Sequence, residues 1–123
     1  MTSAKFEEGL KIRKEVVGEE YVNNSLKNAD ALTMPLQELV TEYCWGSVWS
    51  RDGLPRKTRS LLNLVMLTAL NRPHELRLHL VGAINNGCSK EEIMEALLQT
   101  AIYCGVPAAI DSTKIAKEVL AEL

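Results

Sequence analysis

Two residues near the middle of the sequence carry the side chains best suited to acid-base and anion-binding chemistry, His79 and Arg59. His79 comes three residues after Leu76 and four before Ala83, so on a helix it lies beside an apolar stripe, on the packed side. A histidine titrates near neutral pH and can serve as a general acid or base. A core histidine satisfied by one hydrogen bond explains the same spacing equally well. Arg59 begins an apolar helix, where a cation favours an anionic partner, although a surface role is the alternative.

Two carboxylates and two indoles follow one another along an earlier predicted helix. Glu38, Glu42, Trp45 and Trp49 are separated by four, three and four residues, which predicts one shared helical face. Such carboxylates can orient a histidine or hold an arginine. They equally fit a solvated helix face, and the two indoles equally fit a core.

The histidines and cysteines do not have the spacing of a metal or dithiol site. His74 and His79 flank a glutamate in the string HELRLH, which invites comparison with the zinc motif H-E-x-x-H. Here the histidines are five residues apart, roughly 140° around a helix, so they cannot chelate one ion together. We therefore expect no metal site. Cys44, Cys88 and Cys104 form no C-x-x-C pair, which favours small buried or half-buried thiols in a reducing cytoplasm.

The elements that must position these side chains are all predicted to be helical. Residues 54–87 read as a helical hairpin, because the apolar run SLLNLVMLTAL is followed by a break at Asn71-Arg72-Pro73 and a second amphipathic stretch. We predict an all-α, compact single domain, residues 1–123, of about six helices around this central hairpin. The other predicted helices span residues 4–17, about 35–49 with Thr33 as its cap, 89–102 with a Ser89–Glu92 capping box, and 108–123; residues 19–33 suit a short helix or an ordered loop.

Composition excludes several partners. The 123 residues include 14 basic and 16 acidic side chains, with no basic block that would track a phosphate backbone, so nucleic acid is not an expected partner. The chain has no uncharged apolar run long enough to span a bilayer, and its start lacks the apolar core of a signal peptide. We expect a cytoplasmic protein with no membrane partner. Because 46% of the residues are hydrophobic and nearly every helix has an apolar stripe, we expect a homo-oligomer.

Three stretches carry a family resemblance: RKTRSLLNLVMLTALNR, ELRLHLVGAINNGCSKEEI and EALLQTAIYCGVPAA. They strongly resemble the γ-carboxymuconolactone decarboxylase family, with the motif H-x-x-x-A-x-N-N-G at residues 79–87 and YCGVPAA at residues 103–109. The resemblance implies an all-helical, alkylhydroperoxidase-like fold, ring-shaped homo-oligomers that are typically hexamers, and no cofactor. It also implies a reaction, the decarboxylation of 4-carboxymuconolactone to 3-oxoadipate enol-lactone in the catabolism of protocatechuate.

The implied reaction needs only a few side chains, because the substrate delocalises its own charge. Loss of carbon dioxide leaves a dienolate spread onto the lactone carbonyl oxygen, so no separate electron sink is required. The resemblance implies that His79 is the principal acid-base residue, acting as proton donor to the dienolate or as hydrogen-bond donor to its oxygen. Arg59 is implied to bind a substrate carboxylate, since a guanidinium offers a planar pair of donors.

The remaining candidate residues have weaker roles. Glu38 is expected to orient His79 or to hold the arginine, and Glu42, also a candidate for substrate contact, competes with it for that role. Trp45 and Tyr103 are candidate walls of the substrate pocket, and the core explains both about as well.

Three alternatives stay open at this point. Related alkylhydroperoxidases of the same superfamily carry C-x-x-C-x-x-x-H, and placing their histidine on His79 puts Arg72 and Glu75 where the two cysteines would be. A thiol-dependent peroxidase using Cys104 or Cys44 therefore lacks a resolving partner in sequence. A decarboxylase that acts on another lactone or β-keto acid, and an inactive helical scaffold, are the further alternatives.

Overall fold

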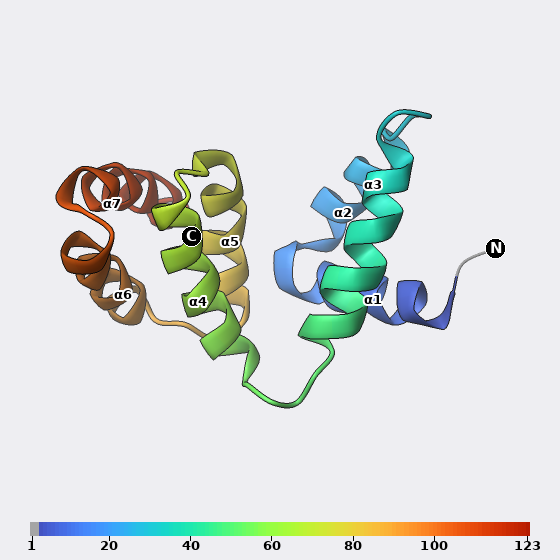
Figure 1. The fold of residues 1–123 in the computed structure, drawn as a ribbon, viewed down its shortest axis with the longest axis horizontal. Coiled ribbons are helices and arrows are strands. Elements are labelled where there is room, and N and C mark those ends of the chain that lie inside the picture. Colours follow the sequence, from blue (N-terminus) through green and yellow to red (C-terminus); the bar gives the residue numbers. More distant parts are fainter. Residues whose placement is uncertain (1–2) are drawn as a thin grey trace. The chain divides into compact units, whose positions relative to one another are not determined.

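The computed structural model describes residues 3–123, and over that range it contains seven α-helices, one π-helical segment and no strand (Figure 1). The all-α prediction is therefore confirmed. In chain order the elements are α1 (Ala4–Val17), α2 (Glu19–Lys27), α3 (Met34–Leu39), the π-helical segment η1 (Val40–Trp49), α4 (Arg56–Ala69), α5 (Pro73–Asn85), α6 (Lys90–Tyr103) and α7 (Val106–Leu120). None of the helices described is long and apolar enough to cross a membrane.

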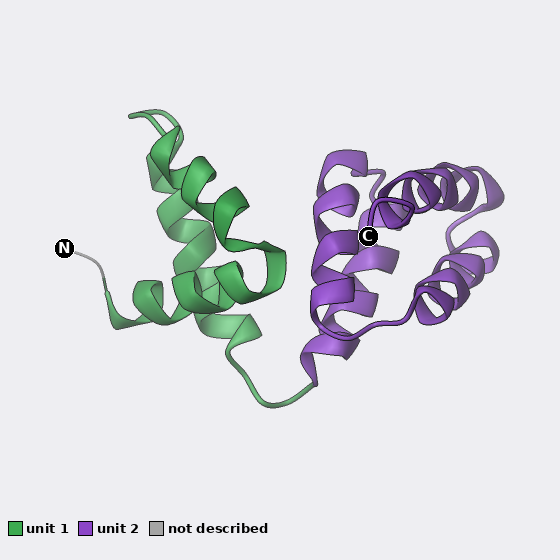
Figure 2. Ribbon diagram, turned by 180° about the vertical axis from the view of Figure 1, so that it is seen from behind, with its two compact units in different colours: residues 1–54 green, residues 55–123 purple. Residues whose placement is uncertain are grey.

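The chain divides into two compact units, residues 1–54 and 55–123 (Figure 2). Unit 1 holds α1, α2, α3 and η1, and unit 2 holds the four helices from α4 to α7. The assignment of the whole chain to one domain stays a prediction.

Glycines let α1 of unit 1 approach η1 closely. A Cβ atom added at Gly9 would lie 2.0 Å from the carbonyl oxygen of Thr41, and one added at Gly46 would lie 2.4 Å from that of Lys5. Both distances are far shorter than any carbon–oxygen contact, so no side chain fits at either crossing point. The two elements pack backbone against backbone, and this packing holds unit 1 together.

The face predicted for η1 is wrong. Trp45 and Trp49 are buried with Thr41, and their rings stack with centroids 4.8 Å apart, whereas Glu38 and Glu42 are exposed. The buried positions recur every four residues because hydrogen bonds from residue i to i+5 widen each turn of a π-helix. A spacing of three, from Glu42 to Trp45, therefore does not keep two side chains on one face. The indoles belong to the core, as the alternative interpretation held.

Two helix starts also differ from the predictions. Thr33 precedes α3 but does not cap it, because its hydroxyl bonds instead to Asp30, accepting from the backbone N–H and donating to the carboxylate. Helix α7 begins at Val106 rather than at residue 108, because Pro107 fits in a first helical turn. Residues 19–33, left open between helix and loop, form α2 followed by a turn.

The predicted hairpin of unit 2 is confirmed, and left-handed residues end both of its helices. After α4, Asn71 adopts a φ of 56°, and the N–H that follows it returns to the carbonyl of Leu67 at 3.0 Å. After α5, Gly87 adopts a φ of 91°, and the N–H of Cys88 returns to the carbonyl of Ala83 at 2.9 Å. Both are Schellman turns, which satisfy the last carbonyls of a helix and set the direction of the next element.

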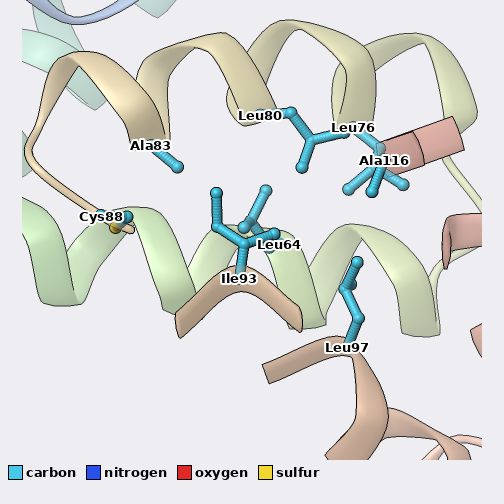
Figure 3. Close-up of a cluster of buried hydrophobic side chains, with 8 residues drawn as sticks. All are labelled: Leu64, Leu76, Leu80, Ala83, Cys88, Ile93, Leu97 and Ala116. Carbon is cyan, nitrogen blue, oxygen red and sulfur yellow. The ribbon is translucent and has the colours of Figure 1, made fainter. Parts of the chain in front are cut away.

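The core of unit 2 lies between the two hairpin helices and the two that follow. Figure 3 shows side chains of α5 pointing toward Leu64 of α4 and Ile93 of α6. The predicted capping box that starts α6 is present, since Ser89 accepts from the N–H of Glu92 at 3.0 Å and the Glu92 carboxylate accepts from the N–H of Ser89 at 2.9 Å. The core consists of Leu64, Leu76, Leu80, Ala83, Cys88, Ile93, Leu97 and Ala116.

Candidate active site

His79 lies where α5 packs against α4, with only 8% of its surface exposed. The amide nitrogen of Asn63, on α4, is 3.4 Å from its Nδ1. His79 follows the buried Leu76 by three residues and directly precedes the buried Leu80, so it sits at the edge of the core, as predicted. His74, in the first turn of α5, is exposed.

Burial lowers the pKa of His79 below its ordinary value of 6.5, because the interior penalises the charged ring. The negative charge of Glu75, one turn earlier on α5, raises this pKa by a smaller amount. The imidazole is therefore predominantly neutral at pH 7. A neutral imidazole can donate through one ring nitrogen and accept through the other.

Arg59 is half-buried near the start of α4, and its Nε is buried without a hydrogen-bond partner among the described residues. Two contacts fix its place relative to His79. Asn63 lies against His79, and Asn86 donates to the Ser60 hydroxyl at 2.9 Å, so the two helices run antiparallel. Arg59 lies one helical turn before Asn63 on α4. It is therefore about one turn from the Asn63–His79 contact along the same helix–helix seam. A half-buried guanidinium with an unpaired donor is suited to an anion.

The other predicted site residues have varied environments. Within unit 1, Trp45 is buried, Glu38 is exposed, and Glu42 is exposed and accepts a hydrogen bond from the Ser3 hydroxyl at 2.9 Å. Tyr103, at the end of α6, is 81% exposed. Their roles toward substrate stay predictions.

Tyr103 lines an apolar groove between α4 and α6, with a volume of about 430 Å³. Met66 and Cys104 also line it, and neither His79 nor Arg59 is among its lining residues. Unit 2 thus has a polar seam between α4 and α5 and an apolar groove between α4 and α6.

All three cysteines are free, but their environments differ. Cys88 is buried and Cys44 half-buried, whereas Cys104 is exposed, contrary to the expectation of three sheltered thiols. Burial raises the pKa of Cys44, against a smaller opposite effect of Arg13, and burial likewise raises that of Cys88. Across residues 3–123, no three histidine, cysteine or acidic side chains are grouped so that they could hold a metal ion.

Asn63 is the residue at this seam whose role the sequence reasoning missed. It is the single amide in the apolar run SLLNLVMLTAL, and it lies four residues after Arg59. That spacing places both on one strip of α4. The strip was visible in the sequence, but the partner of Asn63 on α5 was not.

The low pKa of His79 predicts a loss of stability as the pH falls below about 6.5. The unfolded chain then takes up a proton that the folded chain resists, so the free energy of unfolding falls by up to about 1.4 kcal/mol per pH unit. Urea unfolding between about pH 5.5 and 7, at one protein concentration, measures this slope. His79→Gln should flatten it. The matched control is His74→Gln at the exposed histidine, which should leave the pH dependence of the unfolding free energy as it is in the wild type. Equal slopes for wild type and His79→Gln would contradict the prediction.

Comparison with known proteins agrees with the motifs. Residues 35–118 match the Carboxymuconolactone decarboxylase family. The chain is 48% identical over 118 residues to a nitrosuccinic acid decarboxylase of Metarhizium robertsii, covering 96% of this chain and 82% of the relative. It is 43% identical over 119 residues to a 4-carboxymuconolactone decarboxylase of Acinetobacter baylyi, covering 97% and 89%. An uncharacterized 15.0 kDa protein of Paracoccus denitrificans is 37% identical over 93 residues, 73% of this chain and 67% of its own length. Since the family match spans most of the chain and two relatives align along nearly all of it, this chain belongs to the carboxymuconolactone decarboxylase family.

Proposed function

We propose that this protein is a cofactor-independent decarboxylase that converts 4-carboxymuconolactone to 3-oxoadipate enol-lactone in the breakdown of aromatic acids. The observation that supports the proposal is the packing of α4 on α5, where the buried ring of His79 lies against Asn63, one helical turn after Arg59, whose Nε has no hydrogen-bond partner among the described residues. The relative of Acinetobacter baylyi, 43% identical over 97% of this chain, names the substrate. A small metabolite of this kind agrees with a cytoplasmic location.

The chemistry of this substrate matches what the seam can supply. The carbon that loses carbon dioxide is conjugated through a double bond to the lactone carbonyl, so the electron pair moves onto that oxygen as the bond breaks. The protein must anchor carboxylates, stabilise the new negative charge and allow protonation of the carbon next to the carbonyl. Arg59 is proposed to bind a carboxylate, and His79 to act on the dienolate. Glu38 is a weaker proposal as the group that orients them.

Nitrosuccinic acid is a second candidate substrate, favoured by the 48% identity to the decarboxylase of Metarhizium robertsii. The two acids share a succinate unit, in which the carbon that loses carbon dioxide also bears a CH2–carboxylate group. In nitrosuccinic acid the nitro group takes the electron pair, and in the lactone the conjugated carbonyl does. A site that binds the second carboxylate and donates a hydrogen bond to the charged oxygen meets both needs.

The peroxidase alternative finds less support in the thiols. Attack on a peroxide requires the thiolate, and burial raises the pKa values of Cys44 and Cys88, which reduces their thiolate content. Cys104 is exposed, but it needs a second thiol to resolve its oxidised form.

One pair of assays separates these functions. Purified, metal-free protein should consume 4-carboxymuconolactone, followed by its absorbance, and should not consume peroxide with a thiol donor. Activity should survive replacement of all three cysteines by serine or alanine, and should fall about 10²- to 10⁴-fold in His79→Gln. Cysteine-dependent peroxide consumption alone would overturn the proposal. Turnover of nitrosuccinate alone would assign the second substrate.

Arg59→Lys tests the carboxylate contact. Lysine keeps the charge but loses the planar pair of donors, so the Michaelis constant should rise about tenfold or more. Arg77→Lys is the matched control, because Arg77 pairs with Glu118 on the surface of the same unit and should leave saturation kinetics unchanged. An unchanged Michaelis constant in Arg59→Lys would return Arg59 to a structural role.

We also propose that the chain forms a homo-oligomer. Its resemblance to the family suggests that this oligomer is a hexamer. Five large apolar side chains at the end of α6 and the start of α7 are more than half exposed, which is unusual for a monomer. Light scattering at micromolar concentration should give a mass several times the 13.7 kDa of one chain. A mass near 13.7 kDa would contradict the proposal. The five are Leu98, Ile102, Tyr103, Val106 and Ile110.

A further inference from the structure

The contact between Asn63 and His79 involves only one of the two ring nitrogens. The amide nitrogen of Asn63 lies 3.4 Å from Nδ1. With the amide in this orientation its N–H donates, and Nδ1 must accept with its lone pair. A neutral imidazole carries one proton, which then resides on Nε2.

The same contact opposes the doubly protonated ring. An imidazolium carries a proton on each nitrogen, so its Nδ1–H would meet the donor hydrogens of Asn63 with no acceptor between them. Burial of the ring acts in the same direction. The charged groups nearby come from α5 itself and from the two helices packed on it. Glu75 on α5 acts on His79, Arg59 lies one turn from Asn63 on α4, and Glu118 of α7 is paired with Arg77.

We propose that Asn63 is a positioning residue that holds His79 neutral with its proton on Nε2, so that His79 serves as a hydrogen-bond donor rather than as an acid. The proposal rests on the decarboxylase function and assigns the donor atom within it. A neutral imidazole donor at a developing oxyanion is an established device for stabilising an enolate.

The step balances without an imidazolium. As the carbon–carbon bond to the departing carboxylate breaks, its electron pair moves through the double bond to the lactone oxygen, and carbon dioxide leaves. Nε2–H donates a hydrogen bond to that oxygen and keeps its proton. A water molecule protonates the carbon next to the carbonyl, and the hydroxide that remains combines with carbon dioxide as bicarbonate.

Two variants of Asn63 alter the contact in different ways. Asn63→Asp places an acceptor against Nδ1, which favours the Nδ1–H tautomer and the imidazolium. At a pH where its ring is neutral, the turnover number of this variant should fall on the order of 10²-fold, because Nε2 of the Nδ1–H tautomer presents a lone pair to the substrate oxygen. Asn63→Leu removes the donor with little change in volume, and its turnover number should fall about tenfold. In both variants the Michaelis constant should change less than the turnover number.

Asn86→Leu is the matched control. Asn86 also joins α4 to α5, through its 2.9 Å hydrogen bond to Ser60, but it does not contact His79. A merely structural role for Asn63 would give both leucine variants the same phenotype. We expect Asn86→Leu to lose stability without changing the tautomer of His79 or the pH dependence of the reaction.

Nitrogen-15 NMR of histidine-labelled protein reads the tautomer directly, and His74→Gln in all samples leaves one imidazole to observe. The wild-type background should show Nε2–H at pH 7, and Asn63→Asp should shift toward Nδ1–H or the imidazolium. The turnover number of the wild type should not rise as the pH falls through the low pKa of His79, because the neutral ring already carries Nε2–H, whereas that of Asn63→Asp should rise as its ring becomes an imidazolium and regains Nε2–H.

Several outcomes decide between the alternatives. An Nδ1–H ring in the wild-type background, or a turnover number that rises as the pH falls through the pKa of His79, would overturn the proposal. An Asn63→Asp variant with unchanged tautomer and pH profile would do the same. An Nε2–H ring that depends on Asn63, in a protein with no turnover of 4-carboxymuconolactone or nitrosuccinate, would support the positioning role and count against the decarboxylase function.

Discussion

The close antiparallel packing of α4 on α5 is the constraint on which the candidate site depends. Leu64 from α4 and Leu76 and Leu80 from α5 are fully buried in the core of unit 2, and a Schellman turn ends each helix. Removing such a leucine costs about 2–5 kcal/mol, so the register of the two helices is strongly fixed. That register places Asn63 against His79, so the packing of the core determines which two polar residues meet.

The seam between α4 and α5 contains an imidazole and a guanidinium, two polar groups that are rarely found in protein interiors. Burial lowers the pKa of His79, so its ring is mainly neutral at pH 7, and the half-buried Arg59 has a buried Nε with no hydrogen-bond partner among the described residues. The seam therefore combines a guanidinium, one helical turn before Asn63 on α4, with an uncharged donor on α5. Such an arrangement suits a substrate that arrives with carboxylates and generates its own oxyanion, because the neutral donor stabilises the product-like charge without first binding the carboxylate.

The two related decarboxylases are named for different substrates, but both substrates meet the same chemical requirement. A lactone with a conjugated carbonyl and a succinate with a nitro group look unlike each other, yet each places an electron acceptor next to the carbon that loses carbon dioxide. The acceptor belongs to the substrate. The proposed carboxylate anchor and hydrogen-bond donor suit both substrates, so the walls of the pocket are the part that would distinguish them.

The sequence by itself determined the local architecture. Hydrophobic spacing predicted the hairpin, the break at Asn71-Arg72-Pro73 located its turn, and the Ser89–Glu92 pair located the start of α6, because each depends on residues within one or two helical turns. The motifs of residues 79–87 and 103–109 likewise indicated the family that the comparisons confirmed. Only the tertiary structure decided the rest. The shared face of Glu42 and Trp45 was lost to the π-helical turn of η1, which packs against α1 where Gly9 and Gly46 let the backbones approach closely. Burial lowers the pKa of His79, and the amide that lies against its ring comes from Asn63, sixteen residues away on a neighbouring helix. Spacing along one helix predicts which residues share its face, but the partner across a helix–helix seam is set by the packing register, which exists only once the core has formed.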